Sequence, residues 1–158
     1  MLEADRSLVR LKQFFEPPVQ PDLSCGVDGR CLADTSTYRS VIQRYDNLKQ
    51  ERPAYVQKKK IGVAMDNIPL YAYFFTPDAY ENTVVITAGL HGNEKMGVWA
   101  LLFFLRTLVD EEATLPALDD LRANTRLVVV PVVNPTGFTD GTRQNRNGVD
   151  LNRNFDYR

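Results

Sequence analysis

His91 is the only histidine of this 158-residue chain, and it stands three residues before Glu94 in the sequence His-Gly-Asn-Glu. An imidazole nitrogen and a carboxylate are suitable ligands for zinc, and side chains at positions i and i+3 of a helical turn lie on the same side. A pair of this kind is nevertheless structural more often than metal-binding. Catalytic zinc sites usually have three protein ligands, so the pair leaves a third ligand to be found.

A second group of candidate residues lies in the polar, glycine-containing stretch 143–156. A guanidinium group is a planar fork that binds a carboxylate through two hydrogen bonds. Arginines in such a loop often form only a solvated basic surface, but beside His-Gly-Asn-Glu they indicate a metal centre that faces an anion-binding loop. The candidates are Arg143, Arg146, Asp150, Asn152 and Arg153.

Two apolar segments precede these groups and are expected to position them. Residues 83–89 and 126–133 are short and apolar without alternation, which is typical of strands buried on both faces. Residues 97–112 are apolar nearly all round and predict a mostly buried helix. Strand, helix and strand without a hairpin signal predict a parallel, right-handed βαβ unit. Pro131 indicates a bulge or a locally unpaired side in the second strand.

The segment before this unit predicts a helix and a hairpin. Apolar residues recur at helical spacing in 34–53, where Asp34 to Ser36 can cap the helix and Pro53 can end it. Residues 58–65 and 68–75 are strand-like, and Asp66-Asn67 between them tolerates positive φ. The polar last third of the chain is expected to be a loop. The fold class is therefore α/β, with a mixed, mainly parallel sheet and flanking helices.

The first 37 residues are weakly patterned and form an unassigned extension. Three prolines in Glu-Pro-Pro-Val-Gln-Pro-Asp predict an extended linker. Cys25 and Cys31 are expected to be free thiols, because the chain has no second cysteine pair and its start lacks the apolar core of a secretory signal.

The overall composition is ordinary for a soluble globular protein, with 44% hydrophobic residues, 25% charged residues and a net charge of −1. No basic surface for nucleic acid is indicated. The longest apolar run, 98–105, is far below the about 20 residues that span a bilayer. We expect a soluble protein, cytoplasmic by default, without a nucleic-acid or membrane partner. The composition does not predict an oligomeric state.

Four sequences in register resemble the zinc carboxypeptidases of the M14 (carboxypeptidase A-like) type. They are His-Gly-Asn-Glu, Val-Val-Pro-Val-Val-Asn-Pro-Thr-Gly-Phe, Thr-Arg-Gln-Asn-Arg and Gly-Val-Asp-Leu-Asn-Arg-Asn-Phe-Asp. The resemblance covers residues 38–158, and it implies the N-terminal portion of a zinc carboxypeptidase-like domain. It also implies a mixed α/β sheet that is incomplete at its C-terminal end.

The resemblance implies roles for the metal-binding candidates. His91 and Glu94 correspond to the first two ligands of a single Zn²⁺ ion. Asp150 corresponds to the carboxylate that orients the metal-bound histidine. In the family mechanism, zinc lowers the pKa of a bound water and a glutamate accepts its proton.

The resemblance also assigns the residues that contact substrate, which would be a peptide or peptide-like molecule with a free C-terminal carboxylate. Asn152 and Arg153 correspond to the pair that binds this carboxylate. Arg143 corresponds to the catalytic group that polarises the scissile carbonyl and stabilises the oxyanion. Arg146 corresponds to a secondary carboxylate contact.

The family's third zinc ligand and its general-base glutamate lie downstream of the last matching sequence, and His91 is the only histidine here. We therefore expect a metallocarboxypeptidase-type hydrolase that is inactive as this chain. Two alternatives stay open. One is an aspartoacylase-like or succinylglutamate desuccinylase-like N-acyl amidohydrolase, and the other is a non-catalytic module that binds carboxylates or peptide ends. The preferred C-terminal side chain cannot be inferred.

Overall fold

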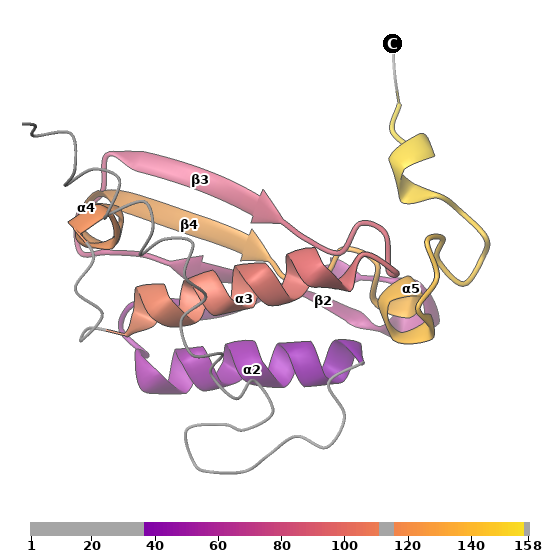
Figure 1. The fold of residues 1–158 in the computed structure, drawn as a ribbon, viewed down its shortest axis with the longest axis horizontal. Coiled ribbons are helices and arrows are strands. Elements are labelled where there is room, and N and C mark those ends of the chain that lie inside the picture. Colours follow the sequence, from indigo (N-terminus) through magenta and orange to yellow (C-terminus); the bar gives the residue numbers. More distant parts are fainter. Residues whose placement is uncertain (1–36, 111–115, 157–158) are drawn as a thin grey trace, which may run out of the picture. The chain divides into compact units, whose positions relative to one another are not determined.

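The computed structural model describes residues 37–110 and 116–156. Their centre is a four-stranded sheet with the order β1-β2-β4-β3 (Figure 1). Strands β1 (Val56–Val63) and β2 (Pro69–Phe75) form an antiparallel hairpin, and β2 also pairs antiparallel with β4 (Thr125–Val130). Strand β3 (Asn82–Thr87) is parallel to β4. The α/β class, the mixed sheet, the hairpin and the parallel pair are as predicted. Two of the three described strand pairs are antiparallel, so the sheet is not mainly parallel as expected.

Two helices, α2 (Tyr38–Glu51) and α3 (Lys95–Val109), cover the same face of the sheet (Figure 1). The core lies between them and the strands. Apolar side chains from both helices and from the sheet are fully buried there, because their burial removes apolar surface from water. The largest of them include Val41, Tyr45 and Leu48 from α2, Leu105 and Leu108 from α3, and Tyr73, Phe75, Leu127 and Val129 from the sheet.

Local sequence signals set several element ends. The Thr37 side chain caps α2 by accepting a hydrogen bond of 3.2 Å from the backbone N–H of Ser40. The cap was expected at residues 34–36, which lie outside the described residues. The hairpin turns through the short helix η1 (Met65–Asn67), where Asp66 and Asn67 have the expected positive φ of 55° and 57°. Strand β4 ends immediately before Pro131, so the proline terminates the strand instead of forming a bulge within it.

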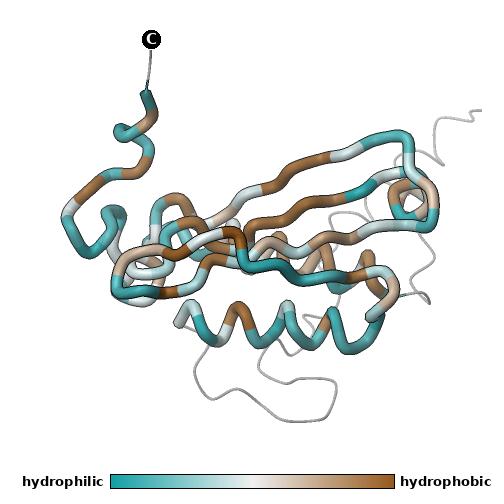
Figure 2. The backbone as a smooth tube through the Cα atoms, turned by 180° about the vertical axis from the view of Figure 1, so that it is seen from behind, coloured by the Kyte–Doolittle hydropathy of each residue, from teal (hydrophilic) through white to brown (hydrophobic). Residues whose placement is uncertain are grey.

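Two expectations about burial were wrong. Strand β3 was expected to be buried on both faces, but it is one of the two edge strands of the sheet, and Val85 is 65% exposed. Helix α3 was expected to be mostly buried, but its fully buried residues form one stripe. Both predictions failed because an apolar run does not say which neighbour will cover it. Figure 2 shows hydrophobic residues along β3 and β4, and a hydrophilic stretch at the lysines of β1.

Three short elements were not predicted from the sequence: α4 (Pro116–Asn124), α5 (Pro135–Asp140) and the 3₁₀ turn η2 (Leu151–Arg153). The last two fall in the polar region expected to be a loop. The predicted linker, Cys25 and Cys31 lie outside the described residues. Within the described part of the chain, every helix is too short or too polar to cross a membrane.

Candidate metal centre and anion-binding loop

The His-Gly-Asn-Glu segment connects the end of β3 to the start of α3, where Glu94 is the N-cap residue. The chain turns at Gly89, whose φ of +63° favours glycine. The carbonyl of Gly89 accepts a hydrogen bond of 3.0 Å from the backbone N–H of Asn134, just past the end of β4. The segment is therefore fixed at the carboxyl ends of the two parallel strands, where open α/β sheets commonly have their sites.

The imidazole of His91 lies between two carboxylates. Its Nδ1 atom is 2.9 Å from Oε1 of Glu94, and its Nε2 atom is 3.3 Å from Oδ1 of Asp150. His91 is buried, with 7% of its surface exposed. A neutral imidazole has only one N–H. When that N–H is donated to Asp150, the lone pair of Nδ1 and an oxygen of Glu94 converge, and this pair of electron donors fits a proton or a metal cation.

Asp150 connects the histidine to Arg143. Its Oδ2 atom accepts a hydrogen bond of 2.9 Å from Nε of Arg143, and its Oδ1 atom accepts one of 3.0 Å from the backbone N–H of Asn152. The Arg143 hydrogen bond is the main reason that the pKa of Asp150 lies below its usual value. Arg143 also lies 3.8 Å from Glu94, measured from Nη1 to Oε1. The structure thus brings His91, Glu94, Asp150 and Arg143 into one cluster.

Asn134 links the start of α5 to the loop that carries Arg143, and it was not identified from the sequence. It is buried, and its Oδ1 atom accepts a hydrogen bond of 3.0 Å from the backbone N–H of Gly137, which caps α5. Its Nδ2 atom donates to the carbonyl of Arg143 at 3.4 Å. The Asn-Pro dipeptide was the available signal, because asparagine caps helices and proline is favoured in the first helical turn.

Close packing of two glycines attaches the His-Gly-Asn-Glu segment to α5. A Cβ atom on Gly92 would overlap the backbone of Gly137. A Cβ atom on Gly137 would in turn meet Nδ2 of Asn134 and lie 2.6 Å from the carbonyl of Gln144. Gly92 is therefore required for the close approach of the two backbones. This packing places the histidine segment against the helix that precedes the arginine loop.

The remaining candidates lie apart from the cluster. Arg146 donates to the carboxylates of Asp140 and Asp66. Asn152 and Arg153 are exposed on η2, and Arg153 donates to the carbonyl of Asn152 at 3.1 Å. Within the described residues, no contact joins Asn152 or Arg153 to His91, Glu94 or Arg143 except through Asp150. In the described residues, Asn152 and Arg153 are therefore linked to the cluster only through Asp150.

The chemistry open to the cluster depends on which of its side-chain atoms could bind a metal ion. Among residues 37–110 and 116–156, no group of three or more histidine, cysteine, aspartate or glutamate side chains is arranged to hold a metal ion. Asp150 lies at the far nitrogen of His91, so the described residues offer one nitrogen and one carboxylate facing each other. An exposed arginine beside them can donate to an anionic ligand. A histidine whose other ring nitrogen is bound by a carboxylate has the orientation that metal-binding histidines usually have.

Comparison with known proteins identifies the family. The family model for zinc carboxypeptidases (Peptidase_M14) matches residues 41–158. The chain belongs to this family, which confirms the resemblance found in the sequence. It is 28% identical over 134 residues to carboxypeptidase A2 of Mus musculus, covering 76% of this chain and 32% of that protein. It is 43% identical over 83 residues to murein peptide amidase A of Escherichia coli (strain K12), covering 52% of this chain and 29% of that protein.

The fold is also shared with solved carboxypeptidases. Carboxypeptidase A from Helicoverpa armigera matches with a TM-score of 0.68 and 22% sequence identity, over 95% of this chain and 41% of that one. Thrombin activatable fibrinolysis inhibitor matches with a TM-score of 0.68 and 23% identity, over 76% of this chain and 34% of that one. The chain spans about a third of the length of the curated relatives described above.

Proposed function

We propose that this chain carries two zinc ligands and the oxyanion-stabilising arginine of a hydrolase that removes C-terminal residues from peptides. The observation that supports the proposal is the position of His91 between Glu94 and Asp150, beside Arg143. In a member of the zinc carboxypeptidase family, this arrangement is suited to binding metal and to stabilising negative charge.

Nδ1 of His91 and the carboxylate of Glu94 would hold the zinc ion. When bound, zinc acts as a Lewis acid and lowers the pKa of water. Asp150 accepts the N–H of the other ring nitrogen, which fixes the tautomer and the orientation of the imidazole. Arg143 has an exposed guanidinium, and it would donate to the carbonyl oxygen on which negative charge develops during peptide hydrolysis.

Asn152 and Arg153 would bind the free carboxylate of the substrate. Their exposure on η2 leaves both side chains accessible to a ligand. A guanidinium fork with a neighbouring amide can form several hydrogen bonds with one carboxylate. In the described residues, η2 is linked to the His91 cluster by the hydrogen bond from the backbone N–H of Asn152 to Asp150.

The polypeptide of residues 1–158 is expected to bind zinc weakly and to lack peptidase activity. It has one histidine, and its described residues offer two donors, whereas catalytic zinc sites usually have three protein ligands.

A second candidate function is hydrolysis of an amide bond in a murein peptide. The 43% identity to a murein peptide amidase favours it. The same zinc donors and arginine would serve both reactions, so the two functions differ in substrate. The N-acyl amidohydrolase and the non-catalytic binding module remain alternatives, and the family assignment favours the peptidase over the first of them.

Zinc titration of the 158-residue polypeptide by isothermal calorimetry tests the proposed metal site. We expect one weak site, and we expect His91→Ala and Glu94→Gln each to abolish it. Glu81→Gln is the matched control, because Glu81 lies beyond the opposite end of β3. Zinc binding that survives both site substitutions would refute the assignment.

A substrate panel tests the activity. The polypeptide with zinc is incubated with blocked dipeptides, their C-terminal amides and murein peptides. No turnover is expected from residues 1–158. Turnover that a chelator abolishes and zinc restores would contradict this expectation, and the preferred substrate would then distinguish the carboxypeptidase from the amidase.

A further inference from the structure

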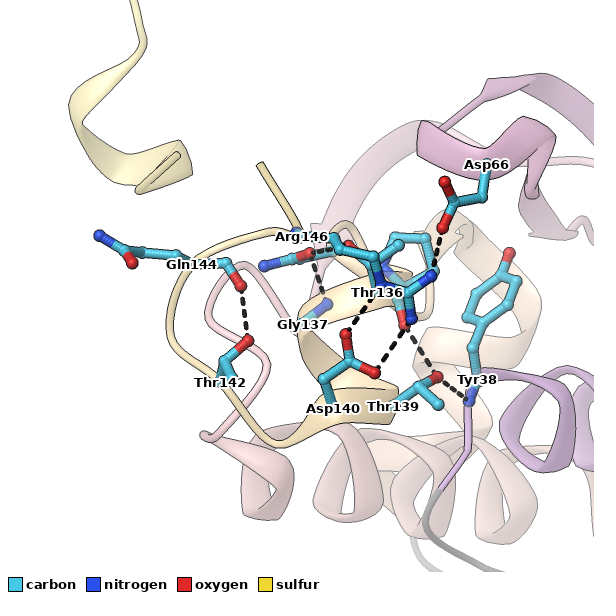
Figure 3. A network of polar contacts seen from close by, with 11 residues as sticks. Tyr38, Asp66, Thr136, Gly137, Thr139, Asp140, Thr142, Gln144 and Arg146 are labelled. Carbon is cyan, nitrogen blue, oxygen red and sulfur yellow. Dashed lines mark hydrogen bonds and ion pairs between the residues drawn. The ribbon is translucent and has the colours of Figure 1, made fainter. Parts of the chain in front are cut away.

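The guanidinium of Arg146 is held by two carboxylates from different parts of the chain (Figure 3). Nε and Nη2 donate to the two oxygens of Asp140, over 3.1 and 3.0 Å, and Nη1 donates to Asp66. The backbone N–H of Arg146 also donates to Oγ1 of Thr136 at 3.2 Å. Both edges of the Arg146 guanidinium therefore already donate hydrogen bonds within the protein, whereas an arginine that binds a substrate carboxylate needs a free edge.

These contacts join the loop of Arg146 to α5, which lies just before it, and to the distant β1–β2 hairpin. Asp140 is the last residue of α5, whereas Asp66 lies in the turn of the β1–β2 hairpin, 80 residues before Arg146. Single exposed ion pairs contribute little to stability. A two-pronged contact to Asp140 and a further contact to Asp66 nevertheless fix where the guanidinium lies, because paired hydrogen bonds restrict both direction and distance.

The loop around Arg146 is itself compact. The side chain of Asn145 accepts hydrogen bonds of 3.0 Å from the backbone N–H groups of Asn147 and Val149. The backbone N–H of Asn145 donates to the carbonyl of Val149 at 3.0 Å. Residues 145–149 therefore form one tight turn, and a shift of Arg146 would move the turn as a unit.

This turn lies between the two residues that contact the histidine cluster from this loop. Arg143 precedes it by two residues, and Asp150 follows it directly. The Arg143–Asp150 hydrogen bond closes the loop across the base of the turn at 2.9 Å. Movement of the turn would change this hydrogen bond and the 3.3 Å contact between Asp150 and His91.

We propose that Arg146 is a positioning residue. Its hydrogen bonds to Asp140 and Asp66 fix the position of the 145–149 turn, and this turn holds Asp150 and Arg143 beside His91. Its consequence for catalysis rests on the proposed function, but the positioning itself does not. The role differs from the secondary carboxylate contact that the sequence resemblance implied.

The single histidine of the chain provides a direct probe. The two ring nitrogens of His91 can be followed by ¹H–¹⁵N NMR without overlap from another imidazole. At fixed pH and without metal, we expect Arg146→Gln to shift both ring-nitrogen signals, because Asp150 would no longer be held in place. With zinc added, we expect about tenfold weaker binding, the lower end of the effect of losing support for a metal-bound histidine.

Arg122→Gln is the matched control. Arg122 also forms an ion pair, with Asp119 at 2.7 Å, and it donates to the carbonyl of Leu108 at 2.7 Å. These contacts attach α4 to the C-terminal end of α3, far along the helix from Glu94. The control should therefore lower stability and leave the His91 ring signals unchanged.

Asp66→Asn is the second variant, which retains the Asp140 contact if Arg146→Gln does not fold. It should shift the ring signals in the same direction by a smaller amount. Unchanged ring signals in a folded Arg146→Gln protein, or an equal shift in Arg122→Gln, would overturn the proposal. Absence of zinc binding by the unsubstituted protein would instead refute the proposed function and leave the metal-free shift as the test of positioning.

Discussion

Gly92 lies directly against the backbone of Gly137, and no side chain fits between them. This contact packs the segment that carries His91 and Glu94 onto α5, although the two glycines are 45 positions apart in the sequence. The segment of His91 and Glu94 and the loop of Arg143 and Asp150 are therefore positioned by backbone packing as well as by side-chain hydrogen bonds.

The first prediction concerns this contact. Gly92→Ala would place a methyl group onto the Gly137 backbone, which cannot rotate away as a side chain can. We expect a loss of about 3 kcal/mol in the free energy of unfolding, the upper end of typical overpacking costs, measured by urea denaturation.

Gly97→Ala provides the control for this measurement. A Cβ atom on Gly97 meets nothing within 4 Å, and the residue lies in α3. Alanine is favoured over glycine in helices by about 0.5–1 kcal/mol, so this variant should be as stable as the unsubstituted protein or more stable. Equal stabilities of the two variants would contradict the packing argument.

The second prediction concerns acid stability. Hydrogen bonding to Arg146 lowers the pKa of Asp140 in the folded protein. The folded state then binds fewer protons than the unfolded state, so this contribution is present above the unfolded pKa of about 4 and is lost as the pH falls through the folded pKa. Asp140→Asn should flatten the decrease in unfolding free energy below about pH 4. An unchanged acid slope, measured by denaturation at a series of pH values, would contradict it.

Much of the fold could be predicted because its elements have local signals. The hairpin is indicated by two strand-like runs around Asp66-Asn67, and the βαβ unit by two apolar strands around an apolar helix. Strand order could not be predicted in the same way. The apolar composition of β3 indicates burial, but its place at the edge depends on pairing between segments far apart in sequence. Helix α5 was missed because its cap, Asn134, stabilises a six-residue helix that contains proline and glycine.

The site was predictable where the resemblance supplied the pairing. Asp150 was expected at the far nitrogen of His91 on this basis, and the structure places it there. No spacing rule predicted the contact of Arg146 with Asp66, because the two residues are 80 positions apart and approach only through folding. The metal-binding and substrate-binding roles themselves remain predictions.

The third prediction tests the proposed carboxylate-binding pair. Arg153→Ala should weaken binding of an N-acetylated amino acid to the polypeptide by about 1.5–3 kcal/mol, the range for hydrogen bonds to charged groups. Arg153→Lys should recover only part of this loss, because lysine cannot form the two-pronged contact. The corresponding amide ligand should bind equally to all three proteins. Calorimetric affinities for the acid that are unchanged by Arg153→Ala would rule out the assigned role.

The last prediction concerns the open edge of the sheet. Strand β4 lies between β2 and β3, and β3 is one of the two edge strands of the sheet. No charged residue or proline interrupts Asn82–Thr87, and such residues normally protect edges from pairing with other chains. Val85 alternates with Val84, which lies opposite the buried Leu127, so Val85 points to the sheet face away from α2 and α3.

We therefore expect the 158-residue polypeptide to self-associate through this edge with increasing concentration. Val85→Lys should weaken the association at least about tenfold, equivalent to about 1.4 kcal/mol, because association would then desolvate a charge at the edge. Met96→Lys adds the same charge at an exposed position at the start of α3 and should have little effect. Sedimentation velocity over a concentration series measures both. A monomer at all concentrations, or equal effects of the two lysines, would show that β3 is not the associating edge.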